Sequence, residues 1–169
     1  NMKHYFSKRN PDLEICSHRT NSIARFIRFN AILDCMEVDI NIENDHLDVR
    51  HSTEDSTSLR LTDLINIQKK KKNILWLDVK KVENKDQCND FLNILKNIYL
   101  KNNKINLFIE LPSDIIKNIQ FYEECISNIK SMNFPISYYI PNDIKTKCTK
   151  ENEQDISNQN NCQYLDNLL

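Results

Sequence analysis

Glycine is absent from the 169 residues of this chain, although it makes up ~7% of an average protein. Gly-rich phosphate loops of the dinucleotide-binding and P-loop kinds therefore cannot form here. Long apolar runs are also missing, so we expect no transmembrane segment and no signal peptide within these residues. Neither sign of charge prevails, because the formal net charge is -1. Attraction to nucleic acid through bulk charge is therefore not expected.

The cysteines form neither a CxxC pair nor a zinc-ligand spacing. They are Cys16, Cys35, Cys88, Cys125, Cys148 and Cys162. Most fall in apolar segments, which predicts buried free thiols. Cys148 and Cys162 flank a polar stretch and would pair if the protein is exported. Free thiols favour a cytoplasmic location, with export as the alternative.

The length and composition are those of one globular domain. Hydrophobic residues make up 40% and charged residues 28% of the chain, which is ordinary for a protein with a core. We expect residues 1–145 to form this domain. Residues 146–169 are predicted to be a polar loop or disordered tail, with a short helix over 164–169.

Short apolar runs alternate with helical periods along the predicted domain. Extended segments are predicted at 13–18, 36–42, 47–51, 74–80, 105–111 and 136–140. Helices are predicted at 21–33, 61–68 with Thr62 as the N-cap, 87–101 and 122–132. This alternation predicts an α/β fold with βαβ units and a parallel sheet. About five strand–helix units are too few for a complete eightfold (β/α) TIM-type barrel. Either the barrel is incomplete, with an unpaired edge through which oligomers could form, or the sheet is open.

Carboxylates share one face of two predicted strands, because residues two apart in a strand point the same way. Glu37 and Asp39 alternate with apolar residues on one strand, and Asp78 and Lys80 do so on another. Burying several like charges is costly unless something offsets them. A divalent cation would do so, since hard cations prefer carboxylate oxygens. The alternative is that Lys80 alone neutralises its acidic neighbours.

Two histidines end predicted extended segments, His18 the first and His51 the one after the second strand. Both should lie at the carboxyl edge of the sheet, where barrel enzymes place their active sites. Arg19 follows His18 and could bind a phosphate oxygen, or it is an ordinary charge at this edge. Glu110 lies near the carboxyl end of the strand predicted at 105–111, on the face that would point into the barrel. It is either an additional site residue or a partner of Lys80.

The order His18-Arg19, Glu37-x-Asp39, His51 and Asp78-x-Lys80 resembles the glycerophosphodiester phosphodiesterase family. Its relatives share the phosphatidylinositol-phospholipase-C-like barrel and include the sphingomyelinase D enzymes. The resemblance spans roughly residues 13 to 80 and implies a TIM-type barrel. It also implies that His18 and His51 act as acid and base and that Glu37, Asp39 and Asp78 hold one Mg²⁺ or Ca²⁺.

The resemblance therefore implies a metal-dependent phosphoric diester hydrolase, or a related phosphotransfer enzyme. Its expected substrate is a small phosphodiester, such as a glycerophosphodiester or a phospholipid head group, and Arg19 and Lys80 would bind the phosphate. The alternative is a non-catalytic barrel that binds a phosphorylated ligand or a partner protein.

Overall fold

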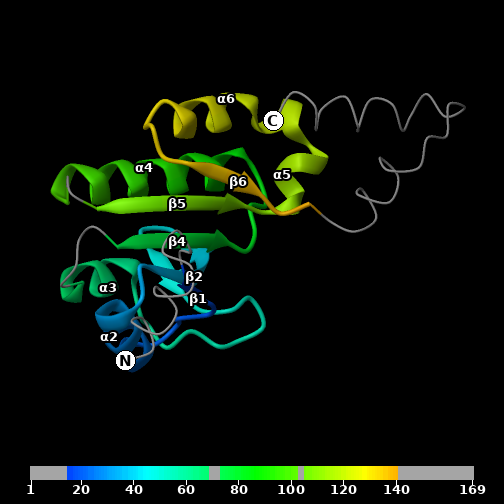
Figure 1. The fold of residues 1–169 in the computed structure, drawn as a ribbon. Helices are drawn as coiled ribbons and strands as arrows, with labels where there is room; N and C mark the ends of the chain where they lie inside the picture. Colours follow the sequence, from blue (N-terminus) through cyan, green and yellow to red (C-terminus); the bar gives the residue numbers. More distant parts are fainter. Residues whose placement is uncertain (1–14, 69–72, 103–104, 141–169) are drawn as a thin grey trace, which may run out of the picture.

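The computed structural model describes residues 15–68, 73–102 and 105–140. Strands and helices alternate along most of this part of the chain (Figure 1). The strands are β1 (Cys16–Ser17), β2 (Cys35–Ile42), β3 (Leu47–Val49), β4 (Ile74–Val79), β5 (Asn106–Leu111) and β6 (Ile136–Tyr138). The helices are α2 (Ile23–Ile32), α3 (Leu61–Ile67), α4 (Lys85–Lys101), α5 (Ser113–Lys117) and α6 (Ile119–Lys130).

The six strands form one mostly parallel sheet. Its order is β1-β2-β4-β5-β6, with parallel pairing between each of these neighbours. Strand β3 pairs antiparallel with the end of β2. Because β4 occupies one edge of β2, β1 and β3 share the other edge. The α/β prediction with a parallel sheet is confirmed, and the segments after β1 and β3 lie along the same side of β2.

One face of the sheet forms the hydrophobic core. Its side chains are at most 1% exposed: Met36, Val38, Ile40, Leu75, Leu77, Val79, Leu107, Ile109 and Leu111. They belong to one apolar cluster with helical residues such as Phe26, Leu64, Phe91 and Ile129. Burying each large apolar side chain contributes about 1.5–3 kcal/mol. The apolar alternation in the sequence therefore determines which face the helices cover.

The opposite face of the sheet carries acidic and aromatic side chains, and on β4 and β5 it is less buried than the core face. On β4 and β5 the residues alternate between buried positions and half-buried or exposed ones, and the half-buried ones include Trp76, Asp78, Phe108 and Glu110. Figure 1 shows α4 and α6 beside β5 and β6, and α2 and α3 near β1 and β2. The acidic residues of the strands therefore lie on the face away from the apolar core.

Several predicted boundaries are corrected. Helix α3 has Arg60, not Thr62, as its N-cap, because Arg60 has an extended backbone and its N–H donates to Asp63 at 2.9 Å. Helix α4 begins at Lys85, two residues early, because the side chain of Asn84 caps it. Helix α5 was not predicted; its five residues are too few to show a helical period.

The prediction of free thiols is wrong for four cysteines. Cys16 and Cys35 form a disulfide between β1 and β2, and Cys88 and Cys125 form another between α4 and α6. The first pair occupies partner positions in the strand register, which brings the two Cβ atoms within bonding reach. Cys148, Cys162 and the predicted tail lie outside the described residues. None of the helices in the described part of the chain has the length and hydrophobicity needed to cross a bilayer.

Candidate metal centre and active site

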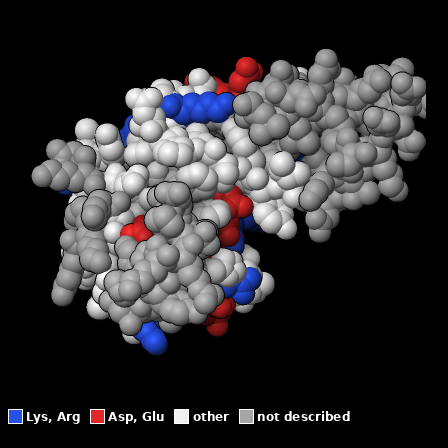
Figure 2. All heavy atoms as spheres, in the orientation of Figure 1, with Lys and Arg blue, Asp and Glu red and all other residues white. Residues whose placement is uncertain are grey.

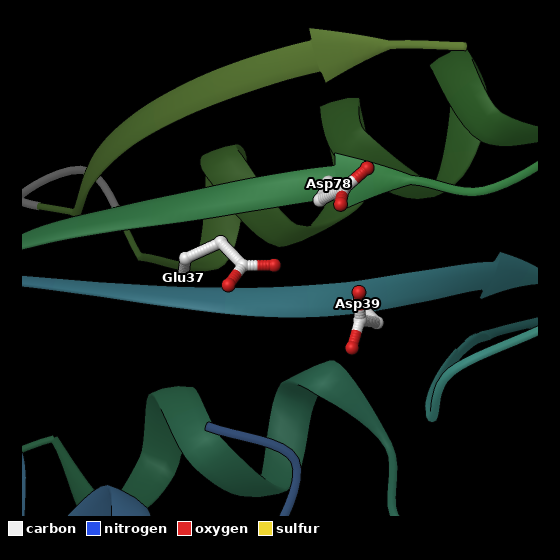
Figure 3. Close-up of side chains that lie close together, drawn as sticks. All are labelled: Glu37, Asp39 and Asp78. Carbon is white, nitrogen blue, oxygen red and sulfur yellow. The ribbon is translucent and has the colours of Figure 1, made fainter. Parts of the chain in front are cut away.

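Strand register aligns acidic residues in a row across the sheet. Asp39 on β2 pairs with Asp78 on β4, which pairs with Glu110 on β5. Glu37 lies one pleat earlier on β2, beside Trp76. Paired residues in a sheet share a face, so all four carboxylates lie on the face opposite the core. Figure 3 shows Glu37, Asp39 and Asp78 projecting from two adjacent strands.

Glu37, Asp39 and Asp78 converge closely enough to share one cation. Each offers a carboxylate oxygen, and these three atoms all lie within 4.8 Å of one another. Glu37 is 4% exposed and Asp39 is fully buried. Glu37 Oε1 is buried and has no hydrogen-bond partner. Carboxylate oxygens are the donors that Mg²⁺ and Ca²⁺ prefer, and Glu37 still has one oxygen without a partner.

Lys80 lies beside two of the three carboxylates. Its ammonium forms ion pairs with Asp39 Oδ1 and Asp78 Oδ2. Burial acts to lower the pKa of Lys80, but hydrogen bonds to Asp39 and Asp78 outweigh it and raise this pKa. Three carboxylates carry three negative charges and Lys80 supplies one positive charge, so two negative charges remain. Lys80 alone therefore does not neutralise the three carboxylates, and one divalent cation would neutralise the rest.

Asn21 holds the carboxylate of Asp39 in place. Its side-chain amide donates to Asp39 Oδ2, and its amide oxygen accepts from the Asp39 backbone N–H at 3.0 Å. Burial acts to raise the pKa of Asp39, but hydrogen bonds from Lys80 and Asn21 together lower it. Asp39 is therefore charged at neutral pH. Asn21 was not among the predicted site residues, although the spacing His18-x-x-Asn21 is similar to that of the sphingomyelinase D enzymes.

Glu37 is held by the segment that follows β1. The backbone N–H of Arg19 donates to Glu37 Oε2 at 2.6 Å, and the N–H of Thr20 donates to the Glu37 carbonyl at 2.8 Å. His18 Nε2 lies 3.5 Å from the same Oε2 atom. The pKa of Glu37 is raised, first by burial, and the nearby Asp39 charge adds to this. Without a cation, the negative charge of the Glu37 carboxylate is therefore unfavourable at this site.

Arg19 adopts a left-handed backbone conformation with φ of 52°. This region is uncommon for a residue with a Cβ atom, and such strain concentrates at functional sites. The conformation accompanies two successive N–H groups, of Arg19 and Thr20, that both donate to Glu37. Thr20 is fully buried and its hydroxyl is 2.6 Å from that of Ser17, so a side chain at this position stabilises the turn.

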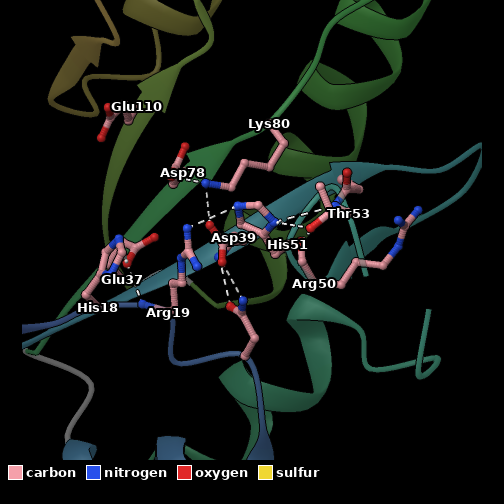
Figure 4. Close-up of polar contacts among 12 residues, drawn as sticks. His18, Arg19, Glu37, Asp39, Arg50, His51, Thr53, Asp78, Lys80 and Glu110 are labelled. Carbon is pink, nitrogen blue, oxygen red and sulfur yellow. Dashed lines mark hydrogen bonds and ion pairs between the residues drawn. The ribbon is translucent and has the colours of Figure 1, made fainter. Parts of the chain in front are cut away.

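His51 lies after β3, on the same side of β2 as Arg19. Its Nε2 is 3.3 Å from Arg19 Nη2, and its Nδ1 is 2.9 Å from Thr53 Oγ1. The side chain of His18 is 73% exposed. Figure 4 shows His18 and Arg19 near Glu37, and His51 near Asp39 and Lys80. The structure thus gathers both histidines around the acidic residues, while their catalytic roles stay predictions.

The hairpin before His51 is fixed by Arg50. Its guanidinium donates to Asp48 at 2.6 Å, to Glu43 at 2.9 Å and to the Glu54 carbonyl at 3.1 Å. The Arg50 backbone N–H also donates to the Asp39 carbonyl at 3.1 Å. These contacts tie the His51 segment to the end of β2, beside the acidic residues.

Glu110 lies apart from the three converging carboxylates. Its Oε2 accepts a hydrogen bond of 2.9 Å from Trp76 Nε1, and Trp76 packs edge-to-face on Phe108. The pKa of Glu110 is raised, first by burial and then by the charge of Asp78. Of the two alternatives for Glu110, pairing with Lys80 is not favoured, because the ion pairs of Lys80 described above are with Asp39 and Asp78.

The surface and the comparisons add two findings. On the described part of the face in Figure 2, basic and acidic side chains are scattered among uncharged ones and form no large basic area. Comparisons with protein families, with curated proteins and with solved structures find no match. The functional conclusion therefore depends on the site itself, with its acidic residues, its histidines and the cationic side chains of Arg19 and Lys80.

Proposed function

We propose that this protein is a metal-dependent phosphodiesterase, with its active site at the carboxyl end of a barrel-type parallel sheet. The observation that carries the proposal is that Glu37, Asp39 and Asp78 converge while Oε1 of Glu37 is buried and without a partner. Two histidines and two cationic side chains surround this group. The resemblance of these residues, in order and spacing, to the glycerophosphodiester phosphodiesterases supports the same activity.

Glu37, Asp39 and Asp78 would hold one Mg²⁺ or Ca²⁺ in this proposal. When bound, the cation supplies charge neutralisation at the phosphate and acidifies a neighbouring substrate hydroxyl. The substrate class is a small phosphodiester, such as a glycerophosphodiester or a lipid head group. Nucleic acid is not expected, because neither the net charge of -1 nor the scattered charges on the described part of the face in Figure 2 favour it.

The two histidines would move the protons of the reaction. One takes the proton of the substrate hydroxyl as the oxygen attacks phosphorus and forms a cyclic phosphate. The other gives a proton to the departing alcohol oxygen as its bond to phosphorus breaks. Hydrolysis of the cyclic phosphate by water then reverses these roles. Arg19 and Lys80 stabilise the negative charge that develops on the phosphate oxygens.

A second candidate function follows from the position of Lys80. Its ammonium already bridges Asp39 and Asp78, so part of the acidic charge is neutralised without any metal. A non-catalytic barrel that binds a phosphorylated ligand or a partner protein is compatible with this contact. Such a module would show no turnover with either metal, which separates the two candidates.

The test compares two histidine variants with a matched control. In the presence of Mg²⁺ or Ca²⁺, His18→Ala and His51→Ala should each lose about 10²–10⁴-fold in the rate of glycerophosphodiester cleavage. Metal affinity, measured by calorimetry, should stay the same, because neither histidine is a proposed ligand. His46→Ala is the control, since His46 bonds to the exposed Asp45 in the β2–β3 turn. Near-normal rates in both variants would refute the proposal.

The wider setting follows from the sheet and the disulfides. In the described residues β6 pairs with β5 alone, so its outer edge is one through which oligomers could form. Light scattering would detect them.

Two disulfides are typical of an oxidising compartment, so we infer export rather than the cytoplasmic location that free thiols had favoured.

A further inference from the structure

Both ring nitrogens of His51 have a protein partner. Arg19 Nη2 lies 3.3 Å from Nε2, and Thr53 Oγ1 lies 2.9 Å from Nδ1. The backbone N–H of Thr53 also donates to Nδ1, at the longer distance of 3.4 Å. Neutral imidazole has one N–H donor and one acceptor nitrogen, so these partners decide which nitrogen carries the proton.

Arginine can only donate hydrogen bonds, because its guanidinium does not lose a proton in proteins. The contact with Arg19 therefore favours an accepting Nε2, which places the proton of neutral His51 on Nδ1. The hydroxyl of Thr53, which can accept, then receives the Nδ1–H bond. The opposite tautomer would place the Nε2–H against the N–H of a cation, and its Nδ1 would accept from the Thr53 hydroxyl or backbone N–H. The contact with Arg19 is therefore what disfavours it, and without the Thr53 hydroxyl only the donating backbone N–H would remain at Nδ1.

We infer that Thr53 is a positioning residue that holds His51 in the Nδ1–H tautomer. This inference rests on the proposed function for its catalytic meaning, but the tautomer itself does not. The Nε2 lone pair is then available to a proton donor, which makes His51 the base of the first step. His18, beside the Glu37 carboxylate at 3.5 Å, is left as the acid.

Arg19 marks the place that the substrate hydroxyl would occupy. Its guanidinium donates to Nε2 in the ligand-free protein, as a hydroxyl would before it loses its proton. When the hydroxyl replaces it, Arg19 becomes free for a phosphate oxygen. The proton passes from the hydroxyl to Nε2 and the hydroxyl oxygen forms its bond to phosphorus, while the bond from phosphorus to the departing alcohol oxygen breaks and His18 gives that oxygen a proton. The Nδ1–H bond to Thr53 persists throughout. A threonine orients the ring without the negative charge that a carboxylate would bring.

The direct test is nitrogen NMR of the His51 ring, which distinguishes the two tautomers by the chemical shift of each nitrogen. At a pH where His51 is neutral, the wild type should show Nδ1 as the protonated nitrogen. Thr53→Val should shift the ring toward the Nε2–H tautomer, and Thr53→Ser should keep the wild-type pattern. Thr57→Val, in the same exposed segment, is the matched control and should change nothing.

Kinetics supply the second measurement. Thr53→Val should lower kcat about 10–100-fold, as the loss of an orienting partner of a functional histidine does. KM and metal affinity should change little, and Thr53→Ser should restore the rate. An Nε2–H tautomer in the wild type, or unchanged ring nitrogens in Thr53→Val, would overturn the inference. A tautomer shift in a protein without any phosphodiesterase activity would uphold the role of Thr53 and refute the proposed function.

Discussion

The backbone N–H of Arg19 donates a hydrogen bond of 2.6 Å to Oε2 of Glu37. This bond joins the end of β1 to the acidic face of β2, and Arg19 adopts a left-handed backbone there. The other carboxylate oxygen of Glu37 is left buried and without a partner. Oε2 is thus bonded to a residue with a strained backbone, whereas Oε1 has no partner. Together these two features point to a ligand for Oε1.

Replacing Glu37 by Gln should weaken binding of Mg²⁺ and Ca²⁺ at least about tenfold, since one of three anionic donors loses its charge. Isothermal titration calorimetry measures this directly. Glu110→Gln is the matched control, because Glu110 lies outside the converging group and should leave metal affinity nearly unchanged. Equal affinity in wild type and Glu37→Gln would argue against the metal centre.

Stability of the metal-free protein should depend on pH through Glu37 and Asp39. The folded-state pKa of Glu37 lies above its ordinary value of 4.5, so its destabilising effect is absent below pH 4.5 and grows as the pH rises through the folded-state pKa. The folded-state pKa of Asp39 lies below 3.8, so its stabilising effect is present above that pH and lost as the pH falls through the folded-state pKa. Without metal, Glu37→Gln should therefore unfold at a higher temperature than the wild type at pH 7 and at the same temperature below pH 4.5. A fixed difference across both pH values would contradict this account.

Removing the ammonium of Lys80 should destabilise the metal-free protein. Lys80→Met leaves the buried carboxylate of Asp39 without its cationic partner, and loss of one member of a buried ion pair costs about 3–5 kcal/mol. Added Mg²⁺ or Ca²⁺ should then raise the melting temperature more in this variant than in the wild type. Lys81→Met is the control, because Lys81 pairs with Glu83 on the surface and should cost less than about 1 kcal/mol. Similar melting temperatures for the two variants would mean that Lys80 does not neutralise the acidic face.

The two disulfides should stabilise the fold by similar amounts, but only the one between β1 and β2 should affect metal binding. They close loops with sequence separations of 19 and 37 residues, and removing either should cost about 2–4 kcal/mol. Paired serine substitutions and chemical denaturation measure this. Loss of Cys16–Cys35 should also weaken metal binding, because β1 is two residues long and leads directly to His18 and Arg19. Loss of Cys88–Cys125, between two helices away from the acidic face, should leave metal affinity unchanged. If the two losses affect metal affinity equally, the β1–β2 link has no special role at the site.

The buried face of each strand follows from the order of its residues alone. Residues two apart must point the same way, so Met36 and Val38 assign one face to the core, and Glu37 and Asp39 necessarily take the other. The same period placed Asp78 and Lys80 together. The order of strands and helices then led to a parallel sheet, because short apolar runs separated by helices can pair side by side only through crossovers. These properties depend on neighbours in sequence, and the structure confirms them.

The alignment of the strands and the contacts between distant segments depend instead on the three-dimensional fold. The register that sets Asp39 beside Asp78 depends on packing across the whole sheet. The same register brings Cys16 to Cys35 and turns two predicted thiols into a disulfide. Contacts such as Asn21 with Asp39, or Thr53 with His51, depend on how each turn folds back over the sheet. No local period encodes that path, because the free energy that selects it comes from contacts between residues far apart in the chain.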